Sequence, residues 1–264
     1  MNNLRKKLLK LDKRIRFVIS TLFLSMIMFV ATFFYFDKAF IFLPLIIAAC
    51  YLLTYFSILE GIEKIEWSML FFMPIVVSIA FYISYFLFPA RWLTRIPFLL
   101  IYAVMVYATL LCSNIFNVGV EKSLQLYRAA FSVNLLFQVI VSYLLINIIF
   151  SFKLFFIFNI ILVFLIIYCL ALQLIWTLKL ELKLEKTVFV FSLLLAVIIS
   201  QLSGVVAFVP FQSNISTLFL TATYYSISGL CLNYLDQKLF KETIREYLTV
   251  LIFVFVVCLF SLSW

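Results

Sequence analysis

The sequence contains no histidine, and its other reactive side chains are few and dispersed. Five cysteines lie at positions 50, 112, 169, 231 and 258, each in a different apolar segment, and none forms a Cys-x-x-Cys pair. Zinc sites, haem attachment and histidine-based catalytic triads need such ligands or bases. We therefore expect no metal and no cofactor, and we interpret the cysteines as small buried hydrophobic residues.

Charged residues are also scarce. Of 264 residues, 12% are charged and 67% are hydrophobic, whereas a soluble domain has about a quarter and about half, respectively. No soluble fold buries that much apolar surface. The composition predicts an all-α protein, a polytopic transmembrane helical bundle.

Nine apolar segments are long enough to cross a bilayer core of about 30 Å, which requires roughly 20 residues per helix. These segments are residues 17–36, 39–59, 68–88, 96–118, 129–150, 154–178, 187–211, 215–235 and 248–264. The segment Leu248–Trp264 is the weakest, because its length as a helix is only about 26 Å. The bundle has eight spans if this segment does not cross.

The basic residues of the connecting segments predict how the chain is threaded. With the N-terminus in the cytoplasm, 16 of the 20 Lys and Arg residues fall on the cytoplasmic side and 4 fall outside. This bias follows the positive-inside rule, so we expect a cytoplasmic N-terminus and an external C-terminus. The same rule accounts for the net charge of +9, and we expect no nucleic-acid partner.

Two segments have the pattern of a basic amphipathic helix. In residues 1–16, leucines and an isoleucine follow one helical face, and seven basic residues accompany them. We expect an interfacial helix there, contacting anionic phospholipid headgroups on the cytoplasmic side, before a single integral membrane domain at 17–264. Residues 236–247 show a similar apolar arc and predict a second interfacial helix. The predicted lipid contacts are Arg5, Lys6, Lys7, Lys10, Lys13, Arg14 and Arg16.

Ionisable groups fall in connecting segments or within about one turn of a span end. A charged residue in the middle of a span costs about 2.5 to 3.5 kcal/mol, and such residues usually mark proton or ion pathways. Their absence from the span centres disfavours proton-relay pumps, intramembrane aspartyl proteases and other enzymes that need a buried acid or base.

Neutral polar residues form stripes along the fifth, sixth and eighth segments. Their spacing places the members of each stripe on one side of a helix. Two interpretations remain open: hydrogen bonds that hold the helices together, or the lining of a polar cleft for a solute or a lipid headgroup. The candidate cleft residues are Asn134, Gln138, Ser142, Asn159, Gln173, Thr217, Thr221, Tyr224 and Ser228.

Three functional hypotheses follow. The first is a non-enzymatic structural or accessory membrane subunit whose basic cytoplasmic surfaces bind anionic lipid or a membrane protein partner. The second is a transporter or flippase-like carrier of a lipid or small amphiphile that uses the polar stripes. The third is an interfacial lipid-modifying enzyme, which rests on loop carboxylates such as the acidic segment Glu60–Glu66. The small size and short loops favour the plasma membrane of a bacterium.

Overall fold

A computed structural model describes residues 12–34, 38–58, 67–89, 91–118, 124–180 and 184–261. Within these ranges the chain forms nine α-helices and no strand. Each helix has at least 19 residues and is apolar enough to cross a membrane. The prediction of an all-α, polytopic membrane bundle with nine spans is therefore confirmed. The helices are α2 (Lys13–Ala31), α3 (Ala39–Ile58), α4 (Trp67–Tyr85), α5 (Trp92–Val118), α6 (Leu124–Ser151), α7 (Phe156–Lys179), α8 (Lys186–Val206), α9 (Ser213–Leu235) and α10 (Lys241–Phe260).

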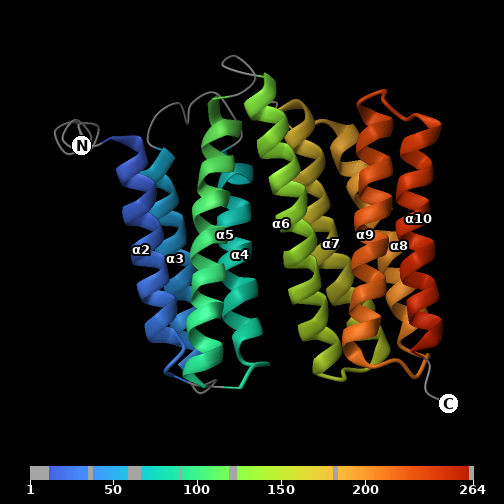
Figure 1. Cartoon of the computed structure of the whole chain (residues 1–264), viewed down its shortest axis with the longest axis horizontal. Helices are drawn as coiled ribbons and strands as arrows, with labels where there is room; N and C mark the ends of the chain where they lie inside the picture. The colour runs from blue at the N-terminus through green and yellow to red at the C-terminus, as the bar shows by residue number, and fades with distance from the viewer. Residues whose placement is uncertain are drawn as a thin grey trace. The chain divides into compact units, whose positions relative to one another are not determined.

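The chain divides into two compact units, Met1–Phe137 and Gln138–Trp264, called unit 1 and unit 2 below. Unit 1 holds α2 to α5 and the first half of α6, and unit 2 holds the second half of α6 and α7 to α10. Within each unit successive helices run in opposite directions (Figure 1). The predicted division into an interfacial helix at 1–16 and one domain at 17–264 stays a prediction.

Short polar side chains connect the helices of unit 1. The hydroxyl of Ser57 in α3 donates a hydrogen bond to Oγ of Ser20 in α2 over 2.8 Å. The hydroxyls of Ser78 in α4 and Tyr102 in α5 lie 3.0 Å apart. Ser113 in α5 donates to the Leu70 carbonyl of α4 over 2.9 Å. Small hydroxyl residues allow close helix approach and add interhelical hydrogen bonds, which is how helices associate in lipid.

Arg95 is a buried cation near the start of α5, where its guanidinium joins three helices of unit 1. Its Nε donates to the hydroxyl of Tyr85 in α4 over 3.1 Å, and its Nη2 donates to the Thr32 carbonyl just after α2 over 3.3 Å. The guanidinium carbon also lies 4.0 Å from the ring centroid of Phe33 and 5.2 Å from that of Trp92. These ring contacts and hydrogen bonds compensate for the removal of the cation from water.

The core of unit 2 is formed by α7, α8 and α9, and α10 packs against α9. Fully buried aliphatic residues fill the space between the helices, among them Ile167 and Leu174 of α7, Leu195 and Ile199 of α8, and Leu220 of α9. Large apolar residues elsewhere on the helices are exposed, as expected for surfaces that face acyl chains.

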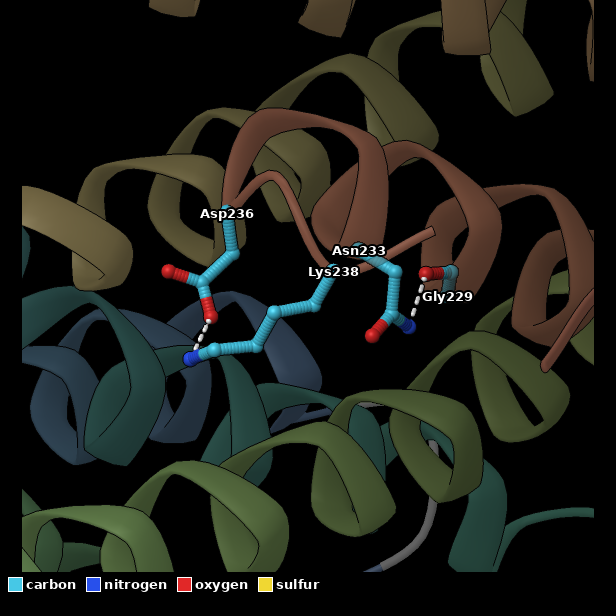
Figure 2. A network of polar contacts seen from close by, with 4 residues as sticks. All are labelled: Gly229, Asn233, Asp236 and Lys238. Atoms are coloured by element: carbon cyan, nitrogen blue, oxygen red, sulfur yellow. Dashed lines mark hydrogen bonds and ion pairs between the residues drawn. The ribbon is translucent and has the colours of Figure 1, made fainter. Parts of the chain in front are cut away.

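The turn between α9 and α10, where Figure 2 shows the ion pair of Lys238 with Asp236, is fixed by local hydrogen bonds. Gln237 has a left-handed backbone with φ of 56°, the Lys238 N–H donates to the Asn233 carbonyl over 2.9 Å, and the Gln237 N–H donates to the Tyr234 carbonyl over 3.1 Å. This pair of bonds is a Schellman motif, which ends a helix sharply. An ion pair of 2.5 Å between Lys238 and Asp236 closes the same turn.

The predicted second interfacial helix over residues 236–247 is wrong. Residues 236–240 form the turn, and α10 runs without interruption from Lys241 to Phe260. Tyr247 of the apolar arc packs on α9, where its ring lies 5.4 Å from that of Tyr225, whereas Phe240 in the turn is 64% exposed. Because α10 begins seven residues earlier than the predicted span, it has 20 residues. This is the length that a helix needs to cross the bilayer core.

Gly229 provides a first test of this packing. A Cβ atom at Gly229 would lie 2.3 Å from the Tyr247 ring, so alanine there must displace α10 or the ring. We expect Gly229→Ala to lower the free energy of unfolding by about 1 to 3 kcal/mol, the usual cost of overpacking. Thermal unfolding in detergent measures the effect.

Gly204→Ala is the matched control, because a Cβ there would meet mainly the flexible end of Ile160, at 2.8 Å. An equal loss of stability in both variants would contradict the close packing of α10 on α9.

A second test concerns Arg95. Lysine cannot reproduce the planar fork or the stacking on two rings. We expect Arg95→Lys to lower the free energy of unfolding by about 2 kcal/mol. The control is Arg91→Lys at an exposed position, which should leave the thermal midpoint almost unchanged. Unaltered stability of Arg95→Lys would show that the guanidinium contacts do not hold unit 1 together.

Candidate functional site

The most extensive side-chain network of unit 2 is centred on Gln138 in α6. The Gln138 side chain is fully buried, and so is that of Tyr224 in α9, while Gln173 in α7 is 2% exposed. All three were predicted from the polar stripes, and the structure brings them together.

The amide of Gln138 uses both of its polar ends. Its Nε2 donates to the Leu170 carbonyl over 3.1 Å and also to Oε1 of Gln173. Its Oε1 accepts a hydrogen bond of 2.6 Å from the Tyr224 hydroxyl. A glutamine amide has two donor hydrogens and two acceptor lone pairs, so three of its four possible bonds are made. One side chain thereby joins α6, α7 and α9.

This geometry favours packing over a cleft lining. The three side chains direct their polar atoms at one another rather than at an open space, and they are too buried to meet a solute. None of them is a carboxylate or an amine, so the network holds no strong acid or base at neutral pH. Each interhelical bond of this kind contributes about 0.6 to 2 kcal/mol in a membrane bundle.

The comparisons with known proteins add no function. No protein-family model, no curated protein and no solved structure matches this chain. Its site residues are therefore interpreted from their own geometry.

Four other stripe residues bond within their own helices or lack a hydrogen-bond partner. Ser142 donates to the Val139 carbonyl, Thr217 to Ser213 and Ser228 to Tyr225, each three or four residues earlier in the same helix. Thr221 Oγ1 is buried and has no hydrogen-bond partner among the described residues. These hydroxyls lie on the predicted helix faces without joining the Gln138 network.

Asn134 and Asn159 also lie away from Gln138. Asn134 is buried on α6, one helical turn before Gln138, and belongs to unit 1. Asn159 lies in the first turn of α7, fourteen residues before Gln173, and lines a separate cavity at that end of the helix. The assignment of the nine stripe residues to one cleft stays a prediction.

The predicted lipid-contacting residues fall partly outside the described ranges. Arg5, Lys6, Lys7 and Lys10 lie there, as does the acidic segment Glu60–Glu66. In the first turn of α2, Arg14 is exposed and Lys13 is half-buried, whereas Arg16 is 1% exposed. Within the described part of the tail, Arg14 and Lys13 thus have surface available to a headgroup.

The groove between α8, α9 and the start of α10 has a volume of about 370 Å³. Apolar side chains line it, including Phe191, Ile227 and Ile244. A smaller cavity of about 230 Å³ lies beside Lys179, Glu185 and Asp236. Lys179 and Glu185 form an exposed ion pair of 2.7 Å.

Sequence reasoning missed two features of the spans. It placed Arg95 in an external loop, whereas α5 begins at Trp92 and buries Arg95. It also underestimated the hydrogen bonds of the first four spans, such as that between Ser20 and Ser57. The aromatic residues Phe33 and Trp92 could have indicated that Arg95 is buried, because aromatic rings stabilise a cation that is removed from water.

A double-mutant cycle tests the Gln138 network. We expect Tyr224→Phe and Gln138→Leu each to lower the thermal stability of the protein, and the double variant to lose less than the sum, with a coupling of about 0.6 to 2 kcal/mol. Tyr168→Phe is the control, because Tyr168 in α7 stacks on Phe164 at 5.9 Å without a hydroxyl contact to Gln138. Fully additive losses would mean that the two side chains do not interact.

Proposed function

We propose that this multi-spanning membrane protein is a non-enzymatic structural or accessory subunit whose helices organise a lipid or protein assembly. The observation that carries the proposal is the Gln138 network, in which buried amide and hydroxyl groups are used for bonds between helices. A carrier needs polar groups that exchange partners with a solute, whereas these groups are already bonded to one another.

The charge distribution of unit 2 supports the proposed threading. Residues 179–186 and 236–246 hold all of its charged residues except Lys153. The described residues of these segments lie at one end of unit 2, where α7 and α9 end and α8 and α10 begin, and their basic residues outnumber the single Lys153 at the other end. We propose that this end faces the cytoplasm of a bacterial cell, bounded by the plasma membrane, and that the N-terminus lies on the same side.

The exposed basic residues at that end support contact with anionic lipid. Lys179, Lys238 and Lys241 are exposed or half-buried, and each basic residue near an anionic leaflet contributes about 1 kcal/mol of attraction. With the N-terminal tail they give the cytoplasmic surface that the proposed subunit uses to bind phospholipid headgroups.

The loop carboxylates give the enzyme hypothesis no comparable support. Asp236 forms an ion pair with Lys238 (Figure 2), whereas Asp37 and Glu121 lie outside the described residues. An interfacial hydrolase or transferase requires a positioned acid or base beside its substrate site. The paired carboxylate of Asp236 supports a role in closing the turn instead.

A lipid-exchange assay tests the proposal against the carrier hypothesis. The full-length protein is reconstituted in vesicles that contain a fluorescent phospholipid, and a membrane-impermeant reductant reports the rate at which the label crosses the bilayer. We expect the rate of protein-free vesicles, because the polar groups of the Gln138 network are bonded to one another.

Rapid exchange by the wild-type protein would contradict the proposal. If Gln138→Leu or Tyr224→Phe then abolished the exchange while Tyr168→Phe retained it, the polar network itself would be the transport path.

A further inference from the structure

A polar cavity lies at the Lys153 end of unit 2, where α6 and α8 end and α7 and α9 begin. Its volume is about 280 Å³. The polar side chains that line it are Lys153, Asn159, Ser213 and Ser216. Because it opens at the ends of membrane-spanning helices, it lies at the depth of the lipid headgroups.

Asn159 is the first reason to expect a ligand there. Its side chain is 4% exposed, and Oδ1 accepts no hydrogen bond from the residues that the structure describes. A buried amide oxygen without a donor is costly, and native proteins rarely leave one unbonded. Gln138, by contrast, uses its amide oxygen to bind Tyr224. The Asn159 oxygen therefore needs a donor that a bound molecule can supply.

Lys153 gives the cavity its charge. The residue has a left-handed backbone, with φ of 49°, and its N–H donates to the Phe150 carbonyl over 3.2 Å. The Asp and Glu residues in the described part of unit 2 lie at the opposite end of the unit: Glu185, Asp236, Glu242 and Glu246. Among the described residues of its own unit, no carboxylate lies near this cation, so Lys153 attracts an anion and repels the ammonium group of a zwitterionic headgroup.

The serines of α9 add hydroxyl groups to the same cavity. Ser213 Oγ lies 3.4 Å from the Phe150 carbonyl, to which it donates, and Ser216 lies one turn further along the helix. Because the O–H of Ser213 is used by Phe150, Ser216 is the serine that supplies a hydroxyl donor to a ligand. A hydroxyl beside a lysine provides the mixture of charge and hydrogen-bond donors from which phosphate oxygens accept.

The surroundings indicate a lipid as the source of the anion. Phe152, Phe155 and Phe208 lie at this end and are 55%, 61% and 71% exposed, which is favourable where acyl chains meet headgroups. The cavity is slightly smaller than the range of about 300 to 1,000 Å³ for sites that enclose a whole small molecule. It therefore has room for a headgroup, with the acyl chains outside against the exposed aromatic residues.

We propose that this cavity binds the phosphodiester headgroup of an anionic phospholipid that carries a headgroup hydroxyl, such as a phosphoglycerol. Lys153 and the Ser216 hydroxyl bind the phosphate, and the headgroup hydroxyl donates to Oδ1 of Asn159. The site is separate from the basic cytoplasmic surface of the proposed function and does not depend on it.

Native mass spectrometry of the full-length protein, titrated in detergent with three lipids, tests the proposal. The lipids are phosphatidylglycerol, phosphatidylmethanol, which has the same charge and no headgroup hydroxyl, and the zwitterionic phosphatidylcholine. We expect the tightest binding for phosphatidylglycerol. Equal affinities for phosphatidylglycerol and phosphatidylmethanol would show that Asn159 does not bind the headgroup hydroxyl and would overturn the proposal. This comparison uses only the wild-type protein.

Two variants locate the site. Lys153→Asn removes the charge and retains a residue that tolerates the left-handed backbone, and we expect it to weaken binding of both anionic lipids about fivefold. Asn159→Leu should reduce phosphatidylglycerol binding to the level of phosphatidylmethanol. Arg91→Gln, which removes an exposed cation of unit 1 that belongs to neither proposed lipid-binding surface, is the control. A loss in this control equal to that in Lys153→Asn would refute the cavity as the binding site.

Soluble glycerol 1-phosphate distinguishes the two sources of the same chemistry. We expect it to leave bound phosphatidylglycerol in place at equal concentration, because it lacks acyl chains. Its binding with an affinity equal to that of the lipid would show that the cavity takes a soluble phosphate ester and would refute the lipid assignment.

Discussion

The structure depends on the requirement that polar groups in a hydrocarbon layer find their partners within the protein. No water is present in the bilayer core to bond an exposed N–H or C=O, and each unsatisfied group costs several kcal/mol. Helices satisfy the backbone, and side chains must then satisfy one another. The hydroxyl and amide bonds that connect the helices of each unit, such as Ser20 with Ser57 and Gln138 with Tyr224, follow directly from this requirement.

The same requirement explains how a cation can lie at the start of a span. Arg95 is removed from water, yet its donors face a tyrosine hydroxyl and a helix-end carbonyl, and its planar face lies against aromatic rings. The carbonyl of Thr32 is available because it follows the end of α2, where carbonyls have no intrahelical donor. The helix end and the guanidinium therefore satisfy each other, and neither requires a carboxylate.

The spans could be predicted because composition and length decide them: an apolar segment of about 20 residues has few alternatives to a membrane helix. What the helix faces contact could not be predicted from periodicity. The apolar arc of residues 236–247 suits a lipid surface and a neighbouring helix equally well, and the structure packs Tyr247 against α9. The position of a residue around the helix axis also does not tell how deep in the membrane it lies. Asn159 and Gln173 lie on the same side of α7, yet they are about 21 Å apart along its axis and have different surroundings.

Depth in the membrane separates the two kinds of polar residue in unit 2. Gln138 lies in the middle of α6, and Gln173 lies six residues, about 9 Å, before the end of α7. At these depths only protein groups can satisfy an amide, and the two amides are bonded to each other. Asn159 lies in the first turn of its helix, close enough to the interface for an outside group to reach it. An unsatisfied amide oxygen is tolerable at that depth because a headgroup or water can complete its bonding. The polar stripes predicted from sequence as one feature thus lie in two different settings: Gln138 and Gln173 bond between helices, whereas the Asn159 oxygen lies at a helix end with no donor among the described residues.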